Sequence, residues 1–461
     1  MKPNWQKAVL VLAVGGVSLS GLAVPAMAAA KPPVSEVKLV VDGQEAALRT
    51  LQVKGVSLVS VRDLARSFGI MPEYAAGSIT LNTEVTVQLK VGSPAYTVNG
   101  ETRQFAAAPF EAGGTVYAEL NSLVEALGGS VEGQGGNAVV HSFQLLDGSF
   151  SSARWISGNR ILAARDDDKS LYVIDAQTKK GTLLTSSEDV AGLTISPDGK
   201  SGIFTAATGE VKVINLQTGL IRTVTTDTSV KTDLVWSADG GTIYFIQGDN
   251  QDKLASLKLD SGAITKLLED KVNFKSDLRV SADGKKLLYI VNVTGVAKND
   301  SNSTEESLTI DYSGAGTQLV QFALDSKDVK PVVLAAGKTN KLYPQLLKDG
   351  SAAYISTDPD AQNPLGSLQL ASAPDKAVQA LPQLDAEETS VTPAGELLVT
   401  GVNKSGQTEL LLVQPDGSAK TVAALTAEVT DAHASADGQT VGLNEGKVVL
   451  ITSAGLTGLT R

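Results

Sequence analysis

The chain has 461 residues, of which 42% are hydrophobic, and its formal charge is −11, with 50 acidic against 39 basic residues. A diffusely acidic surface disfavours nucleic acid and other polyanions as partners. Cysteine is absent, so disulfides, thiolate nucleophiles and cysteine-bound zinc are excluded.

The first 28 residues have the three parts of a secretory signal. Lys2 and Lys7 form a basic start, residues 8–24 are apolar or small, and Ala26-Met27-Ala28 is a small-x-small cleavage site. A membrane anchor is the alternative, but the apolar run is interrupted by glycines and is short against the roughly 20 residues that a span needs. We therefore expect a mature chain from Ala29 with no integral membrane segment, secreted to the extracellular side or associated with the cell wall.

Residues 29–143 contain the same pattern twice. Residues 55–69 align without gaps with residues 114–128, and each copy reads as a short strand, a helix with apolar residues at i, i+3, i+4 and i+7, and a closing glycine. Alternating segments such as 37–41 and 85–91 supply further strands. The sequence therefore predicts a small α+β domain made of two similar halves.

The doubled pattern, followed by Gly129-Ser130-Val131-Glu132, resembles the copper amine oxidase N-terminal-like domain over roughly Val37 to Phe143. The resemblance implies an accessory stalk and not a catalytic domain. Copper amine oxidase catalysis needs three copper-binding histidines, and this chain has only His141 and His433. Copper amine oxidase activity is therefore excluded by counting.

Residues 153–461 repeat a strand–turn–strand unit seven times. Four turns read Ser-x-Asp-Gly and begin at Ser196, Ser237, Ser281 and Ser435, whereas degenerate turns lie at Ser157-Gly158, Asp349-Gly350 and Ala394-Gly395. Units of about 40 to 45 residues with four strands each are typical of β-propeller blades. We expect an all-β propeller with seven blades, six or eight being the alternatives. Residues 144–152 are a linker, or they belong to a closing strand over Val139 to Leu146.

These turns resemble the TolB-type, WD40-like propeller repeat, in which Ser-Pro-Asp-Gly opens the second strand, and Ser196 to Gly199 matches it best. The interval from Gly284 to Gly350 is longer than the others because it holds a polar insertion, Val296 to Thr317. We interpret the insertion as a flexible loop on one face of the propeller, either tolerated or used in recognition.

Few residues are candidates for chemistry. His141 and His433 are far apart in the sequence, which favours ordinary polar histidines over metal ligands. The run Asp166-Asp167-Asp168 lacks the alternate-residue spacing of a calcium loop, and Trp155 and Trp236 occupy matching places that favour packing between blades over stacking on sugars. No serine nucleophile elbow is present. We predict no catalytic, cofactor-binding or metal-binding residue, and no cofactor.

Two functions stay open at this point. The first is an exported noncatalytic binding or scaffold protein, not an enzyme, whose propeller presents a face to an envelope protein or a cell-wall component. The alternative is a propeller hydrolase or lyase with a carboxylate or metal site in the central channel. Three or more carboxylates at one channel mouth would favour the enzyme, and a channel of Ser, Thr and aliphatic side chains would favour the scaffold.

Overall fold

The computed structural model describes residues 32–53, 55–75, 77–83, 85–133, 138–187, 190, 192–298, 309–311, 315–325 and 330–461. The predicted signal, residues 1–28, lies outside them. The chain divides into two compact units: the first contains Ala46–Leu127 and the residues up to Leu39, and the second contains Val40–Glu45, Gly128–Gly133 and Ala138–Arg461. Among the described residues, no helix is long and apolar enough to cross a membrane.

Two sheets precede the repeats. One has the strand order β11 (Ser130–Glu132), β12 (Val139–His141), β1 (Ser35–Val41), β2 (Gln44–Val53), β3 (Val56–Ser60), β10 (Thr115–Glu119) and β9 (Phe110–Ala112). The other consists of β4 (Glu73–Ala75), β5 (Ser78–Asn82), β6 (Thr86–Lys90), β7 (Ala95–Val98) and β8 (Glu101–Gln104).

The predicted duplication is visible in two strand–helix units. Helix α1 (Val61–Ser67) follows β3, helix α2 (Leu120–Ala126) follows β10, and the two strands pair antiparallel. The Ser60 hydroxyl caps α1 by accepting a hydrogen bond from the Asp63 amide at 3.2 Å. Gly69 and Gly128 end the two units at φ +71° and +85°, a backbone conformation that side chains with a Cβ resist. Local signals in the sequence therefore place both helices correctly.

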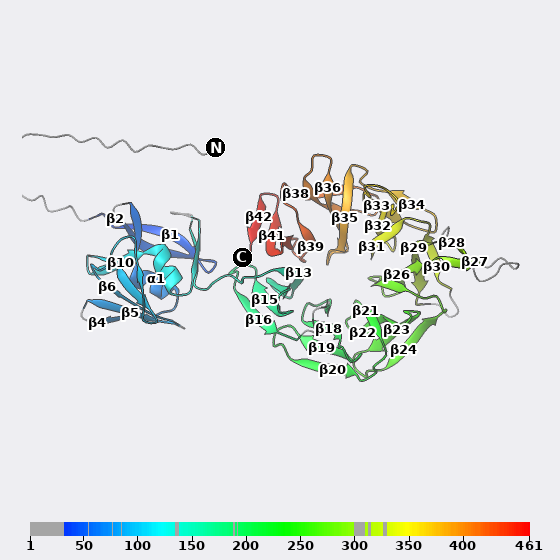
Figure 1. The fold of residues 1–461 in the computed structure, drawn as a ribbon, viewed down its shortest axis with the longest axis horizontal. Helices are drawn as coiled ribbons and strands as arrows, with labels where there is room; N and C mark the ends of the chain where they lie inside the picture. Colours follow the sequence, from blue (N-terminus) through cyan, green and yellow to red (C-terminus); the bar gives the residue numbers. More distant parts are fainter. Residues whose placement is uncertain are drawn as a thin grey trace, which may run out of the picture. The chain divides into compact units, whose positions relative to one another are not determined.

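The second unit contains seven four-stranded antiparallel sheets within the described residues, each formed from strands in chain order. Sheet 1 is β13 (Phe150–Ile156), β14 (Arg160–Arg165), β15 (Leu171–Asp175) and β16 (Gly181–Thr185); sheet 2 is β17 (Thr194–Ile195), β18 (Ser201–Thr205), β19 (Val211–Asn215) and β20 (Ile221–Thr225); sheet 3 is β21 (Lys231–Trp236), β22 (Thr242–Gln247), β23 (Lys253–Lys258) and β24 (Ile264–Glu269). Sheet 4 is β25 (Lys275–Val280), β26 (Lys286–Val293), β29 (Gly316–Ala323) and β30 (Val332–Ala335); sheet 5 is β31 (Asn340–Leu346), β32 (Ala352–Thr357), β33 (Ser367–Ala371) and β34 (Ala377–Gln379). Sheet 6 is β35 (Leu384–Val391), β36 (Leu397–Asn403), β37 (Thr408–Val413) and β38 (Ala419–Leu425), and sheet 7 is β39 (Thr430–Ala434), β40 (Thr440–Asn444), β41 (Lys447–Thr452) and β42 (Gly455–Gly458). Figure 1 shows these sheets following one another around a ring, from green to red, as in a β-propeller.

The predicted insertion in the fourth repeat begins as a hairpin. Strands β27 (Val296–Lys298) and β28 (Thr309–Asp311) pair antiparallel between β26 and β29. Residues 299–308 and 312–314 of the insertion lie outside the described residues, so the predicted loop is described only where the hairpin begins and ends.

The repeated turns share one hydrogen-bond pattern. In sheets 2 to 7 the glycine amide donates to the carbonyl three residues earlier, on Ser196, Ser237, Ser281, Leu347, Thr392 and Ser435. We call this acceptor the turn residue of its sheet, and Ser157 holds the aligned place in sheet 1. In sheet 3 the Ser237 hydroxyl donates to Asp239 Oδ1 at 2.6 Å and accepts from the Thr242 amide at 2.9 Å. The serine and aspartate of the motif therefore pair within the turn, which leaves these aspartates with a structural role.

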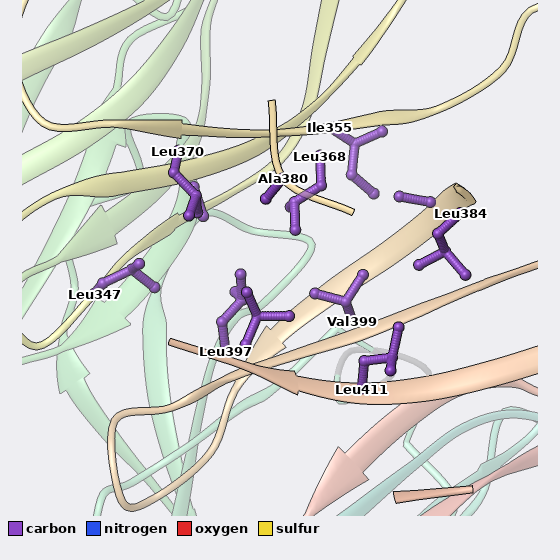
Figure 2. Close-up of a cluster of buried hydrophobic side chains, with 12 residues drawn as sticks. Leu347, Ile355, Leu368, Leu370, Ala380, Leu384, Leu397, Val399 and Leu411 are labelled. Atoms are coloured by element: carbon purple, nitrogen blue, oxygen red, sulfur yellow. The ribbon is translucent and has the colours of Figure 1, made fainter. Parts of the chain in front are cut away.

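Apolar clusters lie between successive sheets. Figure 2 shows Ile355 and Leu368 of sheet 5 facing Leu397 and Val399 of sheet 6, and each of these side chains is at most 1% exposed. A further cluster joins sheet 1 to sheet 7 and includes Phe150 and Val441. Apolar packing between faces therefore connects neighbouring sheets, which share no backbone ladder among the described residues.

Ring closure uses little strand pairing. Strand β13 packs against β39 and β40, while Leu146 forms a single parallel bridge with Thr460. Arg461 donates its amide to the Leu146 carbonyl at 2.9 Å. Residues 139–141 of the expected closing strand pair instead with β1 and β11.

Three lysines are buried where the first strands of sheets 3, 4 and 5 begin. Lys231 Nζ is 2.6 Å from Asp227 Oδ1 and donates to three carbonyls at 2.7 to 3.0 Å. Lys275 Nζ is 2.7 Å from Asp270 Oδ1 and donates to the Asp252 carbonyl at 3.0 Å. Lys341 Nζ donates only to carbonyls, those of Gly337 at 3.0 Å and Thr339 at 2.6 Å. Each ammonium ties a loop to the start of an inner strand.

Candidate functional site

The first strands of the sheets meet at the centre of the ring. Strand β21 packs against β25, β25 against β31, β31 against β35, β35 against β39 and β39 against β13. All six of these strands carry a β-bulge or irregularity, and in β21, β25, β31 and β39 the bulge places two residues opposite one. In each of the latter four bulges one residue has positive φ, at Asp233 (52°), Asp277 (55°), Tyr343 (50°) and Asp431 (56°). Bulges redirect side chains next to functional sites in many sheets.

These residues occupy one repeated position, four residues before the turn residue, which we call the inner acid position. In sheet 6 the same count leads to Glu388, beside the bulge of β35. Acidic residues therefore hold this position in sheets 3, 4, 6 and 7, whereas Ala153 and Gly192 hold it in sheets 1 and 2. No motif of adjacent residues identifies these acids, and they are recognised only when the repeats are aligned on their turn residues.

The carboxylates at this position bond from sheet to sheet. Asp233 Oδ1 accepts from the Asp277 amide at 2.9 Å, and Glu388 Oε2 accepts from the Asp431 amide at 2.7 Å. Asp431 Oδ2 accepts from the Ala153 amide at 3.0 Å, which spans the junction of the two ends of the ring. The inner acids thus help to hold neighbouring sheets together.

Two cavities lie against these strands. One, of about 510 Å³, is lined by Asp277, Glu388, Asp431 and His433, together with Arg154 and Arg279. The other, of about 530 Å³, is lined by Asp233 and again by Arg279. Three carboxylates, from sheets 4, 6 and 7, line the first cavity.

Asp431 is the most strongly paired carboxylate of this site. Its Oδ2 contacts Arg154 Nη1, and its Oδ1 lies 3.5 Å from His433 Nε2. Burial opposes ionisation, but the hydrogen bonds from His433 and Arg154 prevail and lower the pKa of Asp431 to about 2. Burial also lowers the pKa of His433. At neutral pH, Asp431 is therefore an anion and His433 a neutral imidazole.

Glu388 shifts in the opposite direction. Burial, with the nearby Asp431 charge, raises the pKa of Glu388 although the Asp431 amide bonds to its carboxylate. Burial and Asp385 likewise raise the pKa of the neighbouring Glu387. Two adjacent carboxyl groups with pKa values moved apart are the usual arrangement for a proton donor beside a permanent anion. Glu388 and Asp431 are therefore the candidate acid–base pair of this cavity.

The residues considered in the sequence analysis lie in different parts of the structure. His433 joins the inner cluster, whereas His141 lies on β12 and is 1% exposed. Its Nε2 is 3.8 Å from Glu132 Oε1, and neither ring nitrogen has a hydrogen bond within the described part of the chain. Asp168 pairs with Arg165 at the end of β14. Trp155 and Trp236 donate to the carbonyls of His433 (3.1 Å) and Thr194 (2.9 Å) in adjacent sheets, in agreement with packing between blades.

Sequence reasoning singled out none of the inner acids. An acid four residues before the turn residue recurs in four units, and that recurrence was the available signal. Among the described residues, no group of three or more histidine and acidic side chains is arranged to hold a metal ion.

Comparison with known proteins supports the domain types. Residues 40–142 match the family described as copper amine oxidase N-terminal domain. No curated protein matches the sequence. Similar solved structures include the tricorn protease (9% identity, TM-score 0.45, covering 90% of this chain and 45% of that chain) and an oligogalacturonate lyase in complex with manganese (11%, 0.47, 69% and 86%). A puromycin hydrolase is also similar (14%, 0.47, 68% and 54%).

These comparisons correct one expectation. The prediction that the chain is not an enzyme is contradicted, because the similar solved structures include peptidases and a lyase with a propeller fold. The sequence prediction considered only local motifs of catalytic residues, whereas the centre of a propeller is formed by one strand of each sheet. At 9 to 15% identity the likeness shows the fold alone, and this chain spans less than half of the tricorn protease.

Proposed function

We propose that the protein is an exported hydrolase or lyase whose active site is the centre of a seven-bladed propeller. The observation that carries the proposal is the pair of adjacent inner acids with opposed pKa shifts, Glu388 raised and Asp431 lowered, beside a cavity of about 510 Å³. The cavity is large enough for a substrate of several residues or sugar units, since ligand sites are typically about 300 to 1,000 Å³.

Glu388 is the proton-transfer group in this proposal. Its neutral form donates a proton to the leaving atom of the substrate, and its ionised form accepts one from water or from an activated C–H bond. Asp431 stays ionised and holds Arg154 and His433 against the cavity. Arg154 is placed to balance negative charge that develops on the substrate.

The setting we propose is the cell envelope. Residues 1–28 have the composition of an export signal, and the acidic composition suits neutral polymers better than polyanions. The N-terminal domain then acts as an accessory domain that presents the propeller to an envelope protein or a cell-wall component.

Activity screening tests this proposal. The purified chain from Ala29 is incubated with neutral oligosaccharides, with uronate-containing oligosaccharides and with peptide anilides. Hydrolysis is measured as the chromophore released from an anilide or as new reducing ends of an oligosaccharide. Elimination is measured as the ultraviolet absorbance of the new double bond. We expect turnover in one class, and a loss of about 100-fold or more in kcat for Glu388→Gln, because removal of a general acid or base costs at least that much.

Glu101→Gln is the matched control, because Glu101 is an exposed glutamate on β8 in the other unit. Its kcat should equal that of the wild type. Unchanged turnover in the Glu388→Gln variant would refute the role of Glu388, and absence of turnover in every class would refute the enzyme proposal.

A further inference from the structure

A second repeated position lies two residues before each turn residue of sheets 2 to 7, and we call it the channel position. It holds Thr194, Val235, Arg279, Gln345, Ser390 and His433, and each of these residues lines at least one of the two central cavities. Three of these side chains bond to a backbone carbonyl of an adjacent sheet: Thr194 to Leu234, Gln345 to Thr389 and Ser390 to Ala432, each at 3.0 Å. The ordinary role of the channel position is therefore to tie sheets together.

Arg279 does not perform this role. Its Nη1 donates to the carbonyl of the preceding residue, Leu278, at 2.9 Å, and it forms no ion pair within the described part of the chain. In the adjacent sheet 3 the same position, with the same bulge before it, holds Val235. The fold thus accepts an aliphatic side chain here, so a guanidinium is not required for the architecture.

Arg154 provides an internal comparison. Its Nη1 makes the corresponding bond to the Ala153 carbonyl at 3.1 Å, but its charge is neutralised by Asp431. Arg279 is partly buried, and burial lowers its pKa, while the charges of Asp277 and Asp233 act on it without an ion pair. A guanidinium in such a place is destabilising unless an anion completes its hydrogen bonds.

We propose that Arg279 binds a carboxylate of the substrate, so that the ligand of the central site is a monocarboxylate. The guanidinium borders both central cavities, and its planar fork matches a carboxylate through two parallel hydrogen bonds. The charges of Asp233 and Asp277, which act on Arg279, oppose each additional negative charge of a ligand, which disfavours phosphate dianions and polysulfated chains. A uronic acid and the carboxyl terminus of a peptide are the two sources of such a group.

This inference rests on the proposed function, because it names the substrate class of the same site. Isothermal titration of the chain from Ala29 uses glucuronic acid and N-acetyl-alanyl-alanine as probes, each beside its methyl ester, and inorganic phosphate. We expect one acid to bind at least 10-fold more tightly than its ester, and phosphate to bind more weakly than that acid. The acid that binds identifies the source of the carboxylate.

Variants assign the effect to Arg279. Arg279→Val copies the residue of sheet 3 and should weaken binding of the acid at least 10-fold without lowering the thermal transition, and Arg279→Lys should be intermediate because it keeps the charge and loses the fork. Arg222→Val, at an exposed place on β20, should change nothing. Equal binding of acid and ester, no binding of either acid, or unchanged affinity in Arg279→Val overturns the proposal.

The two proposals fail separately. Glu388→Gln should abolish turnover while carboxylate affinity is kept. If no substrate is turned over but Arg279→Val still loses the acid, the catalytic proposal is wrong and the carboxylate site stands.

Discussion

The buried lysines allow a graded test of how the inner strands are held. We consider Lys231→Met and Lys341→Met, which remove an ammonium while keeping a long apolar side chain. Lys231 has no exposed side-chain surface, and its Nζ bonds three carbonyls and Asp227. Among the described residues, Lys341 bonds two carbonyls and no carboxylate.

The expected costs differ because of the carboxylate. Removing the Lys231 ammonium leaves three carbonyls and the Asp227 carboxylate without their donor, but that carboxylate is 43% exposed and water can solvate it. Methionine at Lys231 should therefore lower the free energy of unfolding by about 3 kcal/mol, less than the loss of a fully buried ion pair. For Lys341 two neutral acceptors are lost, but the burial penalty that lowers the pKa of this ammonium is removed as well, so we expect about 1 kcal/mol.

Urea unfolding followed by tryptophan fluorescence measures these values in the second unit alone. Beyond the predicted signal the only tryptophans are Trp155 and Trp236, and both lie in sheets of the ring. Lys200→Met is the control, because the Lys200 side chain is 71% exposed, and it should change stability by less than about 0.5 kcal/mol.

The relative stability losses of Lys231→Met and Lys341→Met test this explanation. If Lys231→Met unfolds at the urea midpoint of the control, the carbonyl and carboxylate contacts contribute nothing, and the explanation fails. If Lys341→Met costs as much as Lys231→Met, the distinction drawn from Asp227 is wrong.

Three further predictions concern the site and the core. Burial raises the pKa of Glu388 above its unfolded value of about 4.3. The stability that its neutral form contributes is therefore complete below about pH 4 and is lost as the pH rises through the folded-state pKa. In urea titrations, Glu388→Gln should be more stable than the wild type at pH 7 and equally stable near pH 4. The lowered pKa of Asp431 works in the opposite sense, so Asp431→Asn should lose about 2 kcal/mol at pH 7, and calorimetry should show the difference vanishing as the pH falls from about 4 towards 2. Leu397 is fully buried between sheets 5 and 6, and Leu397→Ala should cost about 3 kcal/mol in the tryptophan-monitored transition; a loss below about 1 kcal/mol would contradict tight packing there.

Local chemistry explains what could be predicted from the sequence. The Ser-x-Asp-Gly turns reverse the chain through contacts within five residues, such as those of the Ser237 hydroxyl with Asp239 and Thr242. Each turn can therefore be predicted from its own residues. The same is true of the two helices, whose caps and apolar spacing lie within single segments.

The site depends on distance in the chain, and that is why it was missed. Arg154 and Asp431 form one ion pair although 277 residues separate them, and no spacing rule joins them. His433 was considered and set aside as a lone imidazole, because Asp431 and Arg154 become its neighbours only when the ring closes. The repeat itself held part of the answer, since alignment on the turn residues places Asp233, Glu388 and Asp431 at one position.

The way the ring is closed has a consequence for synthesis. Each four-stranded sheet is one continuous run of chain within the described residues, so a sheet can complete its hydrogen bonds as soon as its own strands have emerged. Only the seam between sheets 1 and 7 must wait for the last residues, when Thr460 and Arg461 reach Leu146. The Asp431 bonds to Ala153 and Arg154 belong to that seam. The candidate site is thus completed only when sheet 7 packs against sheet 1, and a chain without sheet 7 can form six sheets but lacks Asp431 and His433.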